Sequence, residues 1–162
     1  NINYPKIKKI LSVFPVTPFI ENYWYQEFTI RHYYNSQNSI KFLKDIIFCL
    51  KDFELEILIK LKRDIPQIDP NYHKFINEIK IKKNIKIIDP KISAISLVDK
   101  SDLVISSPYS SPSFIANNFN VPAIFYDSSN SLTQPEPHIN KIKLIKSETE
   151  LHQWINANIN KS

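Results

Sequence analysis

The sequence predicts an α/β protein with a doubly wound, Rossmann-like and mostly parallel sheet of six strands. Two observations lead to this prediction. Short apolar segments alternate along the chain with segments of helical periodicity, and strands that alternate with helices form parallel βαβ units with right-handed crossovers. The apolar segments are also nearly continuously hydrophobic, which is typical of strands covered on both faces. The length of 162 residues suits one domain, residues 1–162.

The expected strands are apolar runs bounded by turn-forming residues. Pro15 and Pro18 end the first strand, and Asp89 with Pro90 follows the third. Asp, Asn and Pro are typical of the turns at which strands end. In chain order, the six strands are expected at Ile7–Val16, Leu55–Leu61, Ile85–Ile88, Leu103–Ser106, Ala123–Tyr126 and Lys141–Ile145.

Helices are expected between the strands, where apolar residues recur at helical spacing after a capping residue. Ser147 and Glu150 form a capping box that opens the last helix. Tyr23–Tyr34 has no clean period, and we interpret it as a loop with a short helix at most. The expected helices are Ile40 to about Phe53, capped by Asn38 or Ser39; a helix begun by Asp69 or Asn71 that ends at Ile79; Ser93–Val98; Ser113–Asn118; and a last helix to about Ile159.

The absence of glycine excludes two common nucleotide-binding motifs. The chain contains no Gly, so it holds neither a P-loop nor a GxGxxG dinucleotide fingerprint. Backbone positions with positive φ must then be filled by Asn or Asp, the next most tolerant residues. The segment Asn117–Asn120 is the most obvious candidate for such a position.

The reactive residue types do not predict a metal site or a disulfide. Cys49 is the only cysteine, which fits a reducing compartment and a small buried side chain. The four histidines have no ligand spacing with Cys or acidic residues, and the chain contains neither a DxD pair nor a GxSxG elbow. No transmembrane or signal segment is visible, so we expect a cytoplasmic protein. From the missing ligand patterns we expect neither a metal ion nor a cofactor.

The chain is basic, with a formal net charge of +5 at pH 7. Lysines cluster at Lys6–Lys9, Lys60–Arg63 and Lys80–Lys86. This charge suits an anionic ligand or an acidic membrane surface, and it also suits solubility alone. Because no recognised nucleic-acid motif is present, we expect no nucleic-acid partner.

Basic and acidic residues follow two of the expected strands. Lys60, Lys62 and Arg63 stand where the second strand ends, and these cations are suited to a diphosphate. A solvated basic loop is the alternative. Asp89 follows the third strand, where its carboxylate is suited to a ribose or a base edge, although Asp-Pro is also a common way to leave a strand.

The most informative segment is the serine-rich turn after the fourth strand. Its candidate ligand-binding residues are Tyr109, Ser110, Ser111 and Ser113. Hydroxyls and the N–H groups of a helix N-terminus match the oxygens of a phosphate. Ser111 or Ser113 as a simple helix cap is the alternative. Asp127 ends the fifth strand, where its carboxylate either reaches a sugar hydroxyl or starts the next turn.

These segments together resemble the C-terminal, donor-binding half of GT-B glycosyltransferases that make bacterial surface carbohydrates and capsules. The resemblance covers roughly Leu55–Asp127 and rests on LIKLKRDIP, IKIIDPKISAISLVDKSDLVISSPYSSPSFIA and NNFNVPAIFYD. It implies that Lys60 and Lys62 occupy the positions of a basic motif and that Ser110 and Ser111 occupy those of a phosphate-binding serine pair. Two departures are Lys62-Arg63 in place of the His-Pro dipeptide, which argues against a CMP-type donor, and Asn120 in place of a glycine.

The resemblance implies a metal-independent transferase that moves a sugar from a nucleotide donor to a glycan acceptor. The partner domain that holds the acceptor, and commonly the catalytic base, is then a missing N-terminal half, and we expect this chain to be part of a longer two-domain protein. Peripheral contact with the inner face of the membrane is also expected. The alternatives are an enzyme similar to nucleotide-sugar 2-epimerases and a non-catalytic binding module on the same fold. The donor sugar, the acceptor and the linkage are not predicted.

Overall fold

The structure, a computed structural model, confirms the predicted fold class. It describes residues 8–18, 35–62, 68–133 and 141–159. The strands form one sheet in the order β3-β2-β1-β4-β5-β6, and every neighbouring pair is parallel. Their bounds are β1 (Lys9–Phe14), β2 (Leu55–Lys60), β3 (Ile85–Ile88), β4 (Leu103–Ser106), β5 (Ala123–Tyr126) and β6 (Lys143–Ile145).

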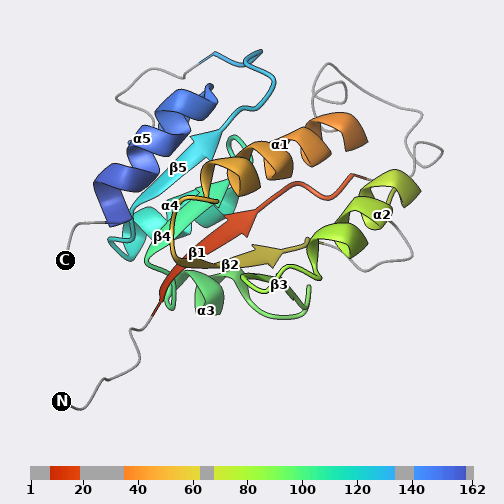
Figure 1. Cartoon of the computed structure of the whole chain (residues 1–162). Coiled ribbons are helices and arrows are strands. Elements are labelled where there is room, and N and C mark those ends of the chain that lie inside the picture. The colour runs from red at the N-terminus through yellow and green to blue at the C-terminus, as the bar shows by residue number, and fades with distance from the viewer. Residues whose placement is uncertain (1–7, 19–34, 63–67, 134–140, 160–162) are drawn as a thin grey trace.

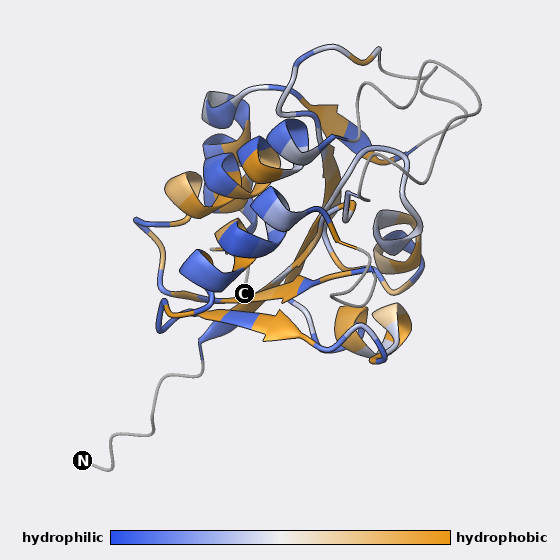
Figure 2. Cartoon of the chain, turned by 90° about the vertical axis from the view of Figure 1, so that its right-hand side faces the viewer, coloured by the Kyte–Doolittle hydropathy of each residue, from blue (hydrophilic) through white to orange (hydrophobic). Residues whose placement is uncertain are grey.

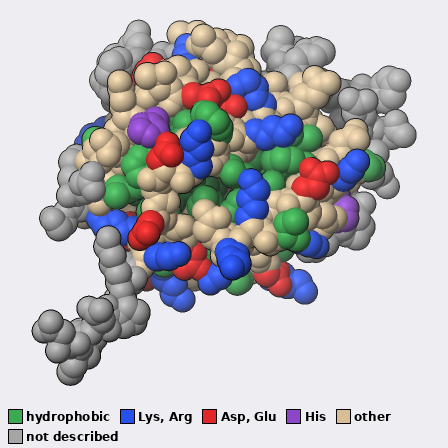
Figure 3. Space-filling view, in the orientation of Figure 1, with side chains coloured by type: hydrophobic (Ala, Val, Ile, Leu, Met, Phe, Trp, Pro, Cys, Tyr) green, Lys and Arg blue, Asp and Glu red, His purple; other side chains and the backbone are tan. Residues whose placement is uncertain are grey.

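Helices cover both faces of the sheet (Figure 1). They are α1 (Ser36–Cys49), α2 (Pro70–Ile79), α3 (Ala94–Val98), α4 (Ser111–Asn118) and α5 (Glu148–Ile159). Helix α1 packs against α2 and α5 on one face, and α3 packs against α4 on the other. Figure 2 shows the apolar strands, in orange, between these two layers. The outer surface of the α1 and α2 layer mixes charged and apolar side chains (Figure 3).

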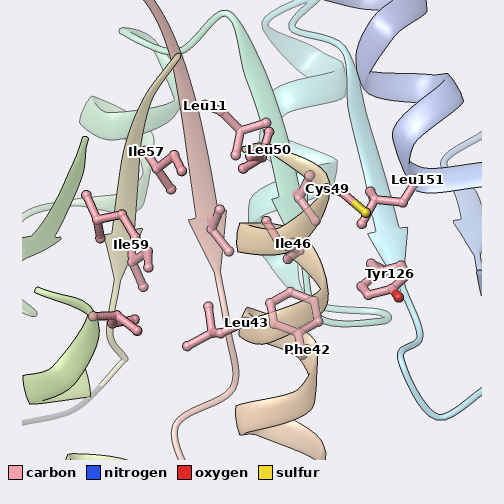
Figure 4. Packing of buried hydrophobic residues seen from close by; sticks show 14 of the residues in the cluster. Leu11, Phe42, Leu43, Ile46, Cys49, Leu50, Ile57, Ile59, Tyr126 and Leu151 are labelled. Carbon is pink, nitrogen blue, oxygen red and sulfur yellow. The ribbon is translucent and has the colours of Figure 1, made fainter. Parts of the chain in front are cut away.

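The larger core lies between the sheet and α1, α2 and α5 (Figure 4). Leu11 of β1 and Ile59 of β2 meet Ile46 of α1 there, and all three are fully buried. The expectation of a buried Cys49 is confirmed, since its side chain is 4% exposed and lies in the same cluster. Burial raises the pKa of its thiol to about 11. Cys49 is therefore a small apolar packing residue rather than a reactive thiolate.

The strand order places a topological switch point between β1 and β4. The chain builds β1, β2 and β3 toward one side and then returns to β4 on the other side of β1. The registers pair Val13 with Ile105 and Phe14 with Ser106, so β1 and β4 end level with each other. The loops that follow them leave in opposite directions, and open α/β sheets bind their ligands outside such a point.

Most element boundaries agree with the sequence, and the clearest differences are at helix starts. The capping box at Ser147 is confirmed by the bond from the Glu150 N–H to its hydroxyl, at 3.3 Å. Helix α1 starts earlier than expected, because the Asn35 side chain rather than that of Asn38 or Ser39 caps it. Tyr23–Tyr34 and Ile7 lie outside the described residues.

Among the described residues, three adopt the left-handed conformation that glycine usually adopts. Asn120 has φ 57°, as the sequence predicts, and Asn130 has φ 54°. The third residue is Tyr109, with φ 60°, which the Asn and Asp rule did not predict. Two contacts hold it there: its ring packs against Phe125, with centroids 5.6 Å apart, and its hydroxyl donates to the Thr133 carbonyl at 2.5 Å. These contacts offset the cost of a left-handed tyrosine, which is about 1–2 kcal/mol.

Candidate functional site

Three loops join at the carboxyl edge of the sheet, around the switch point. The Ser107 hydroxyl accepts a hydrogen bond from the Val16 N–H at 2.9 Å, which ties the loop after β4 to the loop after β1. The Thr17 hydroxyl accepts one from the Lys62 N–H at 3.0 Å, which ties the loop after β1 to the end of β2. We call residues 15–18, 61–62 and 106–111 the switch-point loops. Lys62 and the serine-rich turn therefore lie on the same edge of the sheet.

Helix α4 begins at this edge with an N-terminus that no side chain caps. Ser110 is the N-cap residue, but its hydroxyl turns back and donates to the Ser107 carbonyl at 2.7 Å. Ser111 is the first helical residue and is exposed. Within the described chain, the first-turn N–H groups have no side-chain acceptor, and Pro112 contributes no N–H. An N-terminus of this kind favours an anion, which supplies the missing acceptor.

Ser113, a predicted ligand-binding residue, is not at the surface. Its side chain is fully buried, and its hydroxyl shares a 2.5 Å hydrogen bond with that of Ser106 and donates to the Ile124 carbonyl at 3.0 Å. These bonds fasten α4 to β4 and β5. Ser113 therefore holds the start of α4 against the sheet, and its hydroxyl is not exposed for ligand binding.

The Lys60 side chain, at the end of β2, reaches the loop that follows β3. The Lys60 ammonium donates to the Pro90 carbonyl at 3.0 Å, in the loop that follows β3. Burial lowers the pKa of Lys60, and the nearby Asp89 carboxylate partly opposes this shift. The exposed Asp89 carboxylate accepts from the Lys91 N–H at 2.8 Å, which forms a turn. The Lys60 ammonium is therefore bonded on the β3 side of β2, whereas the Lys62 backbone is bonded to the loop after β1.

Tyr109 connects the loops that follow β4 and β5. Its hydroxyl bond to Thr133 spans the two loops, and its side chain is 41% exposed. Burial, assisted by the nearby Asp127 charge, raises the pKa of the phenol. The hydroxyl therefore stays protonated at neutral pH and can hold this contact as a donor.

Asp127 organises the loop after β5. Its carboxylate is fully buried and accepts hydrogen bonds from the Ser129 N–H at 3.0 Å, the Ser129 hydroxyl at 2.6 Å and the Leu132 N–H at 2.8 Å. The expected alternative, that Asp127 starts a turn, is therefore present in the structure. Its oxygens face the loop's own donors, and a sugar hydroxyl would have to compete with them.

Arg63 lies outside the described residues. Thr17 was not predicted, yet it joins two of the switch-point loops; its position after an apolar strand and before Pro18 was the available signal. Among the described residues, no group of histidine, cysteine and acidic side chains is arranged to hold a metal ion.

The fold and its switch point define a Rossmann-like α/β protein of the doubly wound type. A family profile identifies the particular group. The profile of the polysaccharide biosynthesis PFTS motif proteins matches residues 3–155. The chain therefore belongs to this polysaccharide biosynthesis family. Among curated protein sequences, none matches the chain.

Solved structures with a similar fold include sugar-transferring and sugar-modifying enzymes. UDP-GlcNAc 2-epimerase from Methanocaldococcus jannaschii, solved with UDP-GlcNAc and UDP, has a TM-score of 0.60 at 15% identity, over 96% of this chain and 39% of that one. Escherichia coli heptosyltransferase WaaC, solved with ADP-2-deoxy-2-fluoro heptose, has a TM-score of 0.50 at 15% identity, over 96% and 45%. KpsC from Thermosulfurimonas dismutans, a β-Kdo 2,4 transferase, has a TM-score of 0.47 at 14% identity, over 94% and 45%.

These similarities confirm the predicted fold, which is that of the GT-B proteins. At 15% identity, the roles of individual residues cannot be transferred from those enzymes to this chain. The chain spans less than half the length of each of the three structures. Among the described residues, no helix has the length and apolar character needed to cross a bilayer.

Proposed function

We propose that this chain is the donor-binding half of a glycosyltransferase in bacterial surface polysaccharide synthesis. Membership of a polysaccharide biosynthesis family supports the biological role. The observation that carries the proposal is the α4 N-terminus without a side-chain cap, which begins with the exposed Ser111 and lies on the same sheet edge as the backbone of Lys62. Helix N–H groups, a hydroxyl and an ammonium are the donors that phosphate oxygens need.

The proposed mechanism uses these donors to stabilise a leaving nucleotide. As the bond between the sugar and the phosphate breaks, negative charge grows on the departing phosphate oxygen. The loop before α4 and the backbone of Lys62 are held in place by the bonds among the switch-point loops. The α4 N–H dipoles would therefore oppose this charge with little reorganisation, and the exposed Lys62 side chain would add its positive charge. The acceptor site and the catalytic base would belong to a second domain, because the chain spans only 39% and 45% of the similar enzymes.

Calorimetric titration with nucleotide sugars tests the proposed site. We expect Ser111→Glu to abolish binding, because its carboxylate would occupy the α4 N-terminus in place of phosphate. Lys62→Gln should weaken binding about 10-fold, the loss expected for one charge-assisted contact of about 1.5 kcal/mol. Lys100→Gln is the matched control, since Lys100 is exposed and precedes β4 at the opposite edge of the sheet. Equal affinities for all four proteins would overturn the assigned site.

A second candidate function is that of an enzyme similar to the 2-epimerases. The epimerase from M. jannaschii shares the sheet and has a TM-score of 0.60, against 0.50 for the heptosyltransferase WaaC. Product analysis of the full-length protein separates the two functions. Release of free nucleotide without any acceptor would favour the epimerase-like reaction, whereas release that requires a glycan would favour the transferase. Binding without turnover, with and without a glycan, would indicate a binding module.

A further inference from the structure

A surface pocket of about 250 Å³ lies where α4 ends and β5 begins. Helix α4 starts at the carboxyl edge of the parallel sheet and runs back to the amino edge. The pocket is therefore at the opposite edge from the switch-point loops, and none of their residues lines it. We call it the amino-edge pocket. The residues that line it are Asn117, Asn120, Val121, Pro122, Ala123, Lys141 and Ile142.

Three of these lining residues have polar side chains without a partner in the described part of the chain. They are Asn117, Asn120 and Lys141, and all three are exposed. Their side chains make no hydrogen bond or ion pair with any described residue. No acidic residue is present among the described residues that line the pocket. The pocket thus offers two carboxamides and one positive charge, with no carboxylate to neutralise that charge.

The backbone around the amino-edge pocket is held in place by hydrogen bonds. Asn120 has φ 57° and turns the chain from α4 toward β5. The Val121 N–H donates to the Ala116 carbonyl at 2.9 Å, within the end of α4. The Pro122 carbonyl accepts from the Val104 N–H of β4 at 3.0 Å. Because these bonds fix the turn, binding of a ligand would order little further backbone.

The other four lining residues are apolar, and Ile142 among them is only 4% exposed. A pocket with both apolar and polar lining suits a sugar ring, which has C–H groups on its faces and hydroxyls around its edge. The Lys141 ammonium favours an acidic sugar, because a carboxylate would receive a charge-assisted hydrogen bond from it. The volume is below the roughly 300–1,000 Å³ of pockets for drug-sized ligands, so it suits one sugar unit better than a whole nucleotide sugar.

We propose that the amino-edge pocket binds one carboxylate-bearing sugar unit of a polysaccharide. The carboxylate would contact Lys141, and the sugar hydroxyls would contact the carboxamides of Asn117 and Asn120. The pocket would retain the polysaccharide on the protein at the edge of the sheet away from the switch-point loops, where it has no part in a transfer step. Membership of a polysaccharide biosynthesis family supports this ligand class. The proposal does not depend on the proposed nucleotide site.

Titration with trigalacturonic acid, followed by amide NMR of the protein, tests this proposal. We expect the largest shifts in the side-chain amides of Asn117 and Asn120 and in the backbone amide of Val121. Lys141→Gln should bind about 10-fold more weakly, because a charge-assisted contact is lost. Asn120→Gly should bind about fivefold more weakly, because it loses one neutral hydrogen bond while glycine keeps the left-handed backbone.

Two matched variants change the same residue types outside the pocket, and both should keep the wild-type affinity. Lys82→Gln removes an exposed lysine before β3, at the other end of the sheet from β6. Asn130→Gly replaces another asparagine with positive φ. Equal losses in Lys141→Gln and Lys82→Gln would show a net-charge effect and overturn the proposal.

The fully methyl-esterified trisaccharide tests the preference for a carboxylate, because it has the same rings without their charges. We expect it to bind the wild type about 10-fold more weakly than the acid does. Equal affinity for acid and ester would overturn the proposal, as would shifts confined to other parts of the chain or no binding of the acid. Calorimetry with nucleotide sugars should give the same affinity for Lys141→Gln and the wild type, so failure at one site is distinguishable from failure at the other.

Discussion

Two tyrosines of the core have hydroxyls in opposite circumstances. The Tyr126 hydroxyl donates to the Asp45 carboxylate at 2.8 Å, and the same carboxylate accepts from the Lys41 ammonium at 2.6 Å. The Tyr72 hydroxyl is fully buried and has no hydrogen-bond partner among the described residues. Burial raises the pKa of both phenols, so both stay protonated at neutral pH. The Tyr126 hydroxyl connects β5 to α1. The Tyr72 hydroxyl is removed from water, and no hydrogen bond within the described residues compensates for this.

These two sites predict stability changes of opposite sign for the same substitution. Tyr126→Phe should lower the free energy of unfolding by about 2 kcal/mol, because a buried carboxylate loses a donor. Tyr72→Phe should raise it by about 1 kcal/mol, because a buried polar group without a partner is removed. Urea denaturation of the two variants and the wild type measures both changes. A loss of stability in Tyr72→Phe would show that its hydroxyl has a partner outside the described residues.

At the residue scale, sequence indicates which loops carry polar groups but not where each group points. The sequence places Lys60 and Lys62 two residues apart at one strand end. Only the structure shows that Lys60 turns toward the Pro90 carbonyl while the Lys62 backbone binds Thr17. Ser113 likewise carries a hydroxyl suited to a ligand, yet it bonds within the core. Side-chain direction depends on partners that are distant in sequence, which a single sequence does not reveal.

At the scale of single elements, strands were easier to predict than helix starts. β3, β4 and β5 have the predicted bounds, because continuous apolar runs end at polar or proline residues. The predicted start of α1 was wrong. The segment Asn35–Ser39 offers several possible N-cap residues, and in the structure the N-cap is Asn35. α4 begins at Ser111 rather than at the expected Ser113. Several Asn or Ser residues in a row give nearly equal capping energies, so tertiary packing decides among them.

The loop after β5 should depend on one carboxylate. We expect Asp127→Ala to lower the free energy of unfolding by about 2 kcal/mol, because three hydrogen bonds lose their buried acceptor. The same variant should lose amide-exchange protection at Leu132, whose N–H donates to this carboxylate. Asp89→Ala is the control, because it removes a similar but exposed turn acceptor and should cost less than about 1 kcal/mol. Unchanged protection at Leu132 would contradict the assigned role.

At the scale of the whole molecule, the sheet order predicts a gradient of local stability. β1 and β4 lie at the centre, with strands on both sides and helices on both faces, whereas β3 and β6 are the edge strands. Amide exchange should therefore be slowest in β1 and β4 and fastest in the short edge strand β6. Exchange followed by mass spectrometry measures this order. Protection in β6 equal to that in β4 would mean that a further element covers that edge.

The strand order also divides the chain into two structural halves. Residues 9–88 supply three neighbouring strands and residues 103–145 supply the other three. In the part of the chain that the structure describes, the β1–β4 ladder is therefore the one strand pairing between the halves. Cleavage of the backbone within the Asp89–Ser93 turn would divide the chain into these two halves. Thr17 and Lys62 would remain on one fragment and Ser111 on the other. An anion bound among these residues would therefore contact both fragments and promote their reassembly.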